Sequence, residues 1–153
     1  MFALLTIHNH RRVARTQLAF STFSRTAWDE DFLKARNVFL SLRNDSNGLI
    51  EWAKKEHESS DNVASIKAIL NDYELISIGI ESGILDEAFY FNLIRGALLE
   101  DWSAAKPFVE EIRRRYHYDQ YFQGFQELAE KWSVLQPGQF PLLWYEKLCG
   151  KIC

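Results

Sequence analysis

The sequence predicts an all-α protein, a single helical bundle of about six to seven helices around a buried central helix at roughly residues 62–81. Apolar residues recur at helical spacing in most segments of the chain. Seven glycines and three prolines in 153 residues leave little material for β-turns. No stretch shows the period-2 alternation between turn signals that predicts a strand. The length is that of one domain with its own core, so residues 1–153 are expected to form a single helical domain.

The central helix is predicted from the most hydrophobic long segment, which runs from Asp61 to Asp86. Asp61 can cap its start, because a carboxylate accepts hydrogen bonds from the free amides of a first turn. Gly83 can end it in the left-handed conformation, and Asp86 can cap the next helix. The apolar stripe is wide enough to predict a helix covered on most sides. Its members are Val63, Ile66, Ile69, Leu70, Tyr73, Ile76 and Ile80, with Leu75 and Ile78 on the flanks.

The remaining helices follow from periodicity and capping residues. We expect a break at residues 22–26, a turn at 44–48, and a kink or a helix start at Pro107. Asp29 and Asp119 are expected to cap the helices that they precede. The predicted ranges are 2–23, 29–42, 49–57, 86–100, 102–116, 119–133 and 141–148.

Composition limits the classes of function. The formal net charge of −3 argues against a general nucleic-acid binder, whose affinity depends on a basic surface that releases counterions. The two cysteines, Cys149 and Cys153, both lie in the last five residues, which favours reduced thiols over a disulfide scaffold. The apolar start, Met1 to Ile7, is too short to span a bilayer and precedes its basic residues instead of following them. We therefore expect a cytoplasmic protein without a membrane span.

Several segments together resemble a bacterial and phage family of helical domains of unknown function. The resemblance extends from Arg11 to Trp132 and includes LNDYELISIGIESGILDE, DWSAAKPFVEEIRRR and FQELAEKW. It implies the helical fold and supplies no activity. Many members of that family resemble membrane-anchored proteins with a spanning helix ahead of this domain, whereas here only a short apolar stretch precedes it.

Asn71 and Glu74 are the polar residues of greatest interest, because they lie one turn apart on a helix expected to be buried. A buried carboxylate needs a partner, and Arg36 or Arg95 is the expected one. Such a buried polar network either fixes helix register or tunes Glu74 as a general acid or base. The structural interpretation is favoured. Catalytic, metal-binding and phosphate-binding motifs are absent from the sequence, so no enzyme activity, metal or cofactor is predicted.

Two aromatic clusters are candidates for partner binding. Arg113, Arg114 and Arg115 precede Tyr116 and Tyr118, and this pattern can grip a phosphate backbone or form a solvated helix end. The tail at 137–153 carries Trp144 and Tyr145, residue types enriched at protein interfaces. It is expected to pack on the bundle or on a partner.

These observations favour a non-enzymatic protein-interaction module whose partner is another protein, a homodimer included. The family resemblance adds a concrete hypothesis, a phage-encoded protein that binds and inhibits a host defence protein. The alternatives are a nucleic-acid binder that uses Arg113 to Arg115, and a small enzyme that uses Glu74.

Overall fold

The computed structural model describes residues 2–136 and 138, and the side chains of residue 10 and of residues 13–136. It is all-helical over this range, with five α-helices, two short 3-10 helices and no strand among the described residues. The elements are α1 (Phe2–Ala27), α2 (Glu30–Arg43), η1 (Leu49–Ala53), η2 (Lys55–His57), α3 (Asp61–Glu81), α4 (Glu87–Tyr116) and α5 (Gln123–Ser133). The predicted helix at 141–148 lies outside the described residues.

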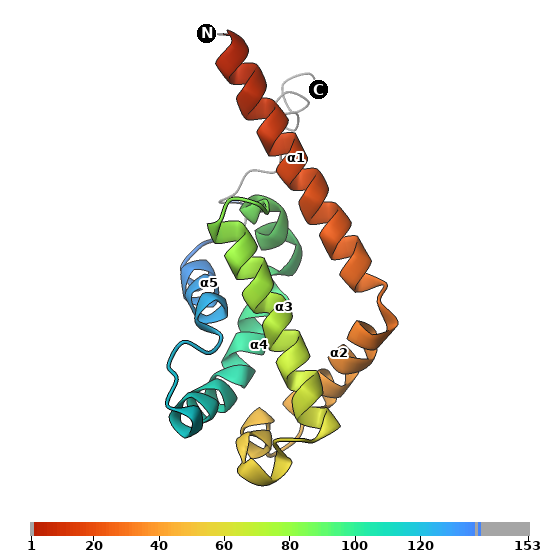
Figure 1. The fold of residues 1–153 in the computed structure, drawn as a ribbon, viewed down its shortest axis with the longest axis vertical. Coiled ribbons are helices and arrows are strands. Elements are labelled where there is room, and N and C mark those ends of the chain that lie inside the picture. The colour runs from red at the N-terminus through yellow and green to blue at the C-terminus, as the bar shows by residue number, and fades with distance from the viewer. Residues whose placement is uncertain (1, 137, 139–153) are drawn as a thin grey trace.

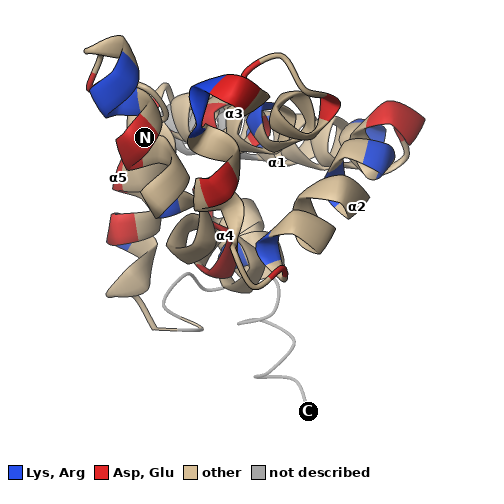
Figure 2. Ribbon diagram, turned by 90° about the horizontal axis from the view of Figure 1, so that it is seen from below, with Lys and Arg blue, Asp and Glu red and all other residues tan. Residues whose placement is uncertain are grey.

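The helices form two layers, with α3 in front of α4 (Figure 1). α3 packs between α2 and α5, whereas α4 packs against η1 and α5. Seen from below, α5 and α2 lie on opposite sides of α3 (Figure 2). α1 runs beside the start of α4 and extends past the other helices at its N-terminal end (Figure 1).

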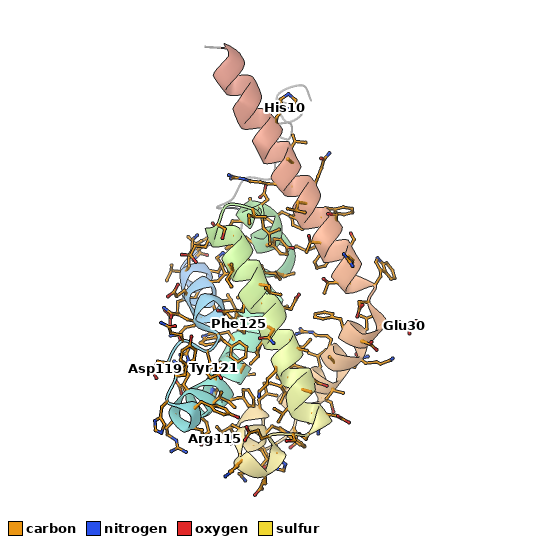
Figure 3. All side chains as sticks on the ribbon, viewed as in Figure 1. His10, Glu30, Arg115, Asp119, Tyr121 and Phe125 are labelled. Atoms are coloured by element: carbon orange, nitrogen blue, oxygen red, sulfur yellow. The ribbon has the colours of Figure 1, made fainter. Side chains whose placement is uncertain are left out.

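Aromatic side chains fill the space where α3, α4 and α5 meet. The fully buried Phe125 ring of α5 stacks on Tyr73 of α3, with ring centroids 4.6 Å apart. Trp102 of α4 meets the same ring edge-to-face at 5.0 Å. Figure 3 shows Phe125 directed towards these helices. Large rings in offset or edge contact bury much apolar area and hold the three helices in register.

α1 continues to Ala27, so the break predicted at residues 22–26 is wrong. The Thr26 hydroxyl donates to the Thr22 carbonyl oxygen over 3.2 Å, so this side chain bonds within its own helical turn and does not end the helix. Phe23 meets the Phe89 ring of α4 edge-to-face, with centroids 6.4 Å apart. This tertiary contact outweighs the weak helix propensity of the Ser and Thr residues around it.

α3 matches the predicted central helix in extent and differs from it in two respects. Its N-cap is Ser60, whose hydroxyl accepts from the Val63 amide over 3.3 Å, and not Asp61. Gly83 ends it with φ of 65° as predicted, in a turn where the Leu85 amide donates to the Gly79 carbonyl. The helix is also not buried all round, because Leu75 and Ile78 are exposed.

α4 is one helix of 30 residues, although two helices were predicted at 86–100 and 102–116. Asp86 caps its start as predicted and accepts from the Phe89 amide over 3.0 Å. Pro107 lies inside the helix without ending it. A proline leaves the carbonyl four residues earlier, here that of Ser103, without its helical donor. Both Ser103 and Pro107 are exposed, so water can supply the missing hydrogen bond.

The shorter elements also differ from their predicted bounds. The 49–57 segment forms η1 and η2 instead of one short helix, after the predicted turn at residues 44–48. Asp29 caps α2 as predicted, with Oδ1 accepting from the Phe32 amide over 2.8 Å. Asp119 does not cap α5, which begins at Gln123 after Phe122, a residue with φ of 55°. Figure 3 shows Asp119 in the connection that precedes α5.

Candidate functional site

Asp101 is the centre of a buried polar cluster that joins α2, α3 and α4. Asp101 is completely buried, and its carboxylate accepts hydrogen bonds from three donors. Arg43 Nη1 lies 2.6 Å from Oδ1, and the Tyr73 hydroxyl donates to Oδ2 over 2.8 Å. Arg36 Nη1 also donates to Oδ2. Two guanidinium groups and a phenol thus satisfy a carboxylate that could not otherwise remain charged in a core.

The sequence interpretation missed Asp101, although two signals pointed to it. Asp101 lies within the apolar stripe of α4, between buried Leu98 and Ala105, where a charged residue demands a partner. Arg36 and Arg43 are seven residues apart on α2, so two helical turns place them on one face. The predicted helix ranges 86–100 and 102–116 place Asp101 at a boundary between two helices, whereas it lies inside α4.

A cavity of about 250 Å³ lies beside this cluster, enclosed by the C-terminal end of α1 and by the helices α2, α3 and α4. Its walls are mostly apolar, and Arg36, Asp72, Tyr73 and Tyr90 supply its titratable groups. Burial raises the pKa of Asp72 to about 6, and the positive charge of Arg36 opposes this rise. Burial likewise raises the pKa of Tyr90 to about 12, with a further contribution from Asp72.

The predicted network of Asn71, Glu74, Arg36 and Arg95 does not exist as one cluster. Asn71 is exposed, because α3 turns that face outward. Glu74 accepts from the Gly124 and Phe125 amides over 3.1 and 2.7 Å, so it caps the first turn of α5. Arg95 donates to the Trp132 and Leu135 carbonyl oxygens at the other end of α5. Arg36 belongs to the Asp101 cluster.

α5 is therefore held at both ends by side chains from other helices. Glu74 of α3 supplies a negative group to the amides of its N-terminus, and Arg95 of α4 supplies a positive group to the carbonyls of its C-terminus. Both match the helix dipole. Glu87 of α4 adds a third contact, because it accepts from the Trp132 indole over 3.0 Å.

The arginine cluster at the end of α4 is engaged within the molecule. Arg113 donates to the Tyr121 carbonyl oxygen and to Gln126, although its Nη2 atom is buried without a hydrogen-bond partner among the described residues. Arg114 forms a two-pronged pair with Glu111. Arg115 donates to the Ala53 carbonyl oxygen and to Glu58.

The two tyrosines beside these arginines lie at the surface. Tyr116 donates to Glu58, and Tyr118 donates to Gln120 over 2.9 Å. Both rings also contact Tyr121. The tail residues Trp144 and Tyr145, the other candidates for partner binding, lie outside the described residues.

Glu51, Glu56 and His57 form the group of potential metal ligands found among the described residues. One ligand atom from each lies within 4.8 Å of the others. Lys54 Nζ approaches Glu51 to 2.6 Å, so a cation already neutralises that carboxylate. The group is at the surface, where acidic clusters are common without an ion.

The outward side of α3 carries a regular strip of six residues, four of them apolar, which we call the outer α3 face. Successive residues of this face are four, three, four, three and four positions apart in the sequence, and all of them are exposed. They are Ala64, Ala68, Asn71, Leu75, Ile78 and Ser82. Leu75 keeps 67% of its surface exposed and Ile78 keeps 48%. From Ala64 to Ile78 the average spacing is 3.5 residues, which is that of a helix seam that packs against another helix.

No helix in the described part of the chain combines the length and the hydrophobicity that crossing a membrane requires. The comparison with curated proteins gives no significant match, and the comparison with solved structures gives none either. The comparison with protein families matches residues 1–132 to a domain of unknown function. Because this match covers most of the chain, the protein belongs to the family named Domain of unknown function DUF4760.

Proposed function

We propose that the protein is a non-enzymatic protein-interaction module that binds through the outer α3 face. The observation that carries the proposal is the exposure of Leu75 and Ile78 on a helix whose opposite side is fully packed. Exposed apolar side chains are common singly, whereas an ordered strip of them along one helix is typical of a binding surface.

The outer α3 face is suited to binding because it is preorganised. α2 and α5 pack along the two sides of α3, so the helix does not have to fold or reorient when a partner arrives. Asn71 interrupts the apolar strip near its middle, and a polar residue at such a position specifies the register of a helix pair.

The two alternative functions have less support. Both carboxylate oxygens of Glu74 accept hydrogen bonds from backbone amides of α5. This arrangement favours a capping role for Glu74 over a role as general base. Arg113, Arg114 and Arg115 each bind groups of the same chain, and a phosphate backbone would have to displace those contacts.

A photo-crosslinking experiment tests the proposed surface. A photoreactive phenylalanine analogue replaces Leu75 in one variant and the exposed Glu127 of α5 in a matched control. Irradiation in living bacterial cells should give a discrete protein adduct from position 75 and none of that mass from position 127. If position 75 gives no discrete adduct, the outer α3 face is not a binding surface.

A phage-encoded inhibitor of a host defence protein is a competing hypothesis about the partner, which the family resemblance suggests and which excludes a second copy of this chain. It predicts an adduct at position 75 whose second component is a host protein. Mass spectrometry of the adduct identifies that component, and an adduct containing only this chain contradicts the hypothesis.

A further inference from the structure

We infer that the outer α3 face binds the same face of a second copy of the chain, with the two α3 helices antiparallel. This inference rests on the proposed function and names its partner. A two-fold symmetric contact uses one patch twice, so the patch must be complementary to itself when it is reversed. The outer α3 face has this property in both side-chain size and charge.

Side-chain size changes along the outer α3 face. Its first half carries the small Ala64 and Ala68, and its second half carries the large Leu75 and Ile78. Antiparallel packing places Ala64 of each helix against the larger Leu75 of the other, so the surfaces can interdigitate there. Ile78 lies one turn further out, opposite the exposed Asp61 at the start of the second α3. Parallel packing would set Leu75 against Leu75 and leave a gap between the facing alanines.

The register follows from the same spacing. A two-fold axis near residue 70 sets Ala64 opposite Leu75 of the second copy and Ala68 opposite its Asn71. Both pairs are centred between residues 69 and 70, and seam positions of antiparallel helices meet in such layers. The alanines allow the helices to approach closely, and the asparagine contributes a polar group near the axis.

Charge on one flank agrees with this register. Lys67 and Glu74 lie seven residues apart on the side of α3 that faces α5, each beside the outer α3 face. In the antiparallel pair, Lys67 of each copy comes near Glu74 of the other, so the opposite charges attract. The Glu74 carboxylate keeps its hydrogen bonds to the Gly124 and Phe125 amides of its own chain, and the attraction does not replace those bonds. A shift of one helical turn towards the C-terminus would bring the two Glu74 residues together at the axis, where like charges repel.

The available area predicts a weak dimer. From Ala64 to Ser82 a helix rises about 27 Å, and a strip about one helix diameter wide is a small interface. Such an area lies at or below the lower end of stable specific complexes. The dimer should therefore form at roughly micromolar concentration or above and dissociate on dilution.

Sedimentation velocity of the full chain tests self-association. Over a dilution series from about 500 to about 1 μM, the average mass should fall from dimer towards monomer. Replacing Leu75→Glu together with Ile78→Glu should raise the dissociation constant at least about tenfold, because two charges would be buried in the contact. The matched control is Leu93→Glu with Ser103→Glu, which adds the same charge to exposed positions of α4 and should leave the dimer unchanged.

Cysteine crosslinking tests the orientation. Asn71→Cys and Ala64→Cys are made separately in a background where Cys149 and Cys153 are replaced by serine. In the antiparallel dimer, the two copies of position 71 lie about 5 Å apart along the helix axis, and the two copies of position 64 about 17 Å apart. A short bis-maleimide linker should therefore join the Asn71→Cys chains and not the Ala64→Cys chains. Equal crosslinking of both variants would overturn the antiparallel arrangement.

The results separate this inference from the proposed function. A chain that stays monomeric at every concentration, yet gives a heterologous adduct from position 75, overturns the homodimer and keeps the interaction surface. A monomer that gives no adduct overturns both. A dimer that Leu75→Glu and Ile78→Glu do not weaken places self-association on another surface and also overturns the inference.

Discussion

Asp101 and Asp72 are two acids beside the same arginine with opposite consequences for stability. Asp101 is paired with Arg36, Arg43 and Tyr73, so its charge is compensated. Asp72 feels Arg36 only through longer-range attraction, and burial raises its pKa to about 6. A charged Asp72 therefore opposes folding at neutral pH, whereas a charged Asp101 supports it.

Replacing Asp101→Asn should destabilise the protein by about 3–5 kcal/mol, because the change leaves two partly buried guanidinium groups without their counter-charge. Tyr73→Phe removes one hydrogen bond from the same carboxylate and should cost less, about 1.5–3 kcal/mol. Urea unfolding of both variants checks the order. Equal losses would contradict a role for Asp101 as the charge that holds the cluster together.

Replacing Asp72→Asn should stabilise the protein at pH 7 by roughly 1–3 kcal/mol. The folded protein holds the Asp72 proton up to about pH 6, whereas the unfolded chain releases it near the ordinary value of 3.8. The Asp72 contribution is thus most favourable below pH 3.8 and is lost as the pH rises towards 6. Unfolding free energies measured from pH 4 to pH 7 should diverge between wild type and variant as the pH rises. Asp31→Asn, at an exposed position of α2, is the control and should give parallel curves.

At the level of the element, α5 depends on groups that its own segment lacks. Phe122 occupies the N-cap position in the left-handed region and offers no side-chain cap. The absence of a side chain at Gly124 allows the Glu74 carboxylate to approach the start of α5 closely. A Cβ atom at this position would lie only 3.2 Å from Oε1 of that carboxylate. The fit between the glycine and the glutamate is what allows one side chain to serve two amides.

Replacing Glu74→Gln should cost about 1–2 kcal/mol, because it removes the negative charge at the N-terminus of α5 and weakens two hydrogen bonds. Gly124→Ala should destabilise through the same contact, since the added methyl displaces the carboxylate. The double variant should therefore lose less than the sum of the two single losses. Chemical denaturation of the three variants measures the coupling, and strict additivity would contradict a shared mechanism.

Much of the helical pattern was accessible from the sequence, whereas the pairing of polar groups was not. Asp29, Asp86 and Gly83 were identified because a cap or a left-handed turn depends on the residues next to it. Asp119 does not cap α5, because the first turn of this helix is capped by Glu74, fifty residues before Gly124 in the sequence. Local patterns cannot reveal such a partner.

The same contrast between local sequence pattern and long-range packing applies to the outer α3 face. The sequence shows that Leu75 and Ile78 are apolar, but it does not show that α2 and α5, which flank α3, leave this side of the helix uncovered. The width of the apolar stripe predicted a helix covered on most sides, with Leu75 and Ile78 on its flanks. How many neighbours a helix has is a property of the assembled fold, and it decides whether the same stripe is core or surface.

At the scale of the whole molecule, the described side chains of α1 attach it to the other helices through few contacts. Phe20 and Phe23 both meet the Phe89 ring of α4, each with centroids 6.4 Å apart. Thr16 donates to Asp86 over 2.7 Å, so the carboxylate that caps α4 also holds α1. The position of α1 therefore depends on the start of α4 more than on the core between α3 and α5.

Replacing Phe89→Ala should release α1 while leaving the other helices folded, because the change removes both ring contacts at once. Hydrogen exchange measured by mass spectrometry should show faster exchange in peptides from α1 and unchanged protection in α3 and α5. The control Leu93→Ala alters an exposed side chain of the same helix and should change neither. Loss of protection throughout the chain would show instead that α1 belongs to one cooperative unit with the core.

The capping of α5 from other helices also limits what protein engineering can do with this segment. Residues 119–136 carry a strongly amphipathic helix, yet the groups that define its two ends are at positions 74 and 95. A graft of this segment onto another scaffold would transfer its apolar face without its boundaries, and the ends would fray. A transplantable unit has to include α3 and α4 together with α5, so the smallest portable piece of this fold is three helices and not one.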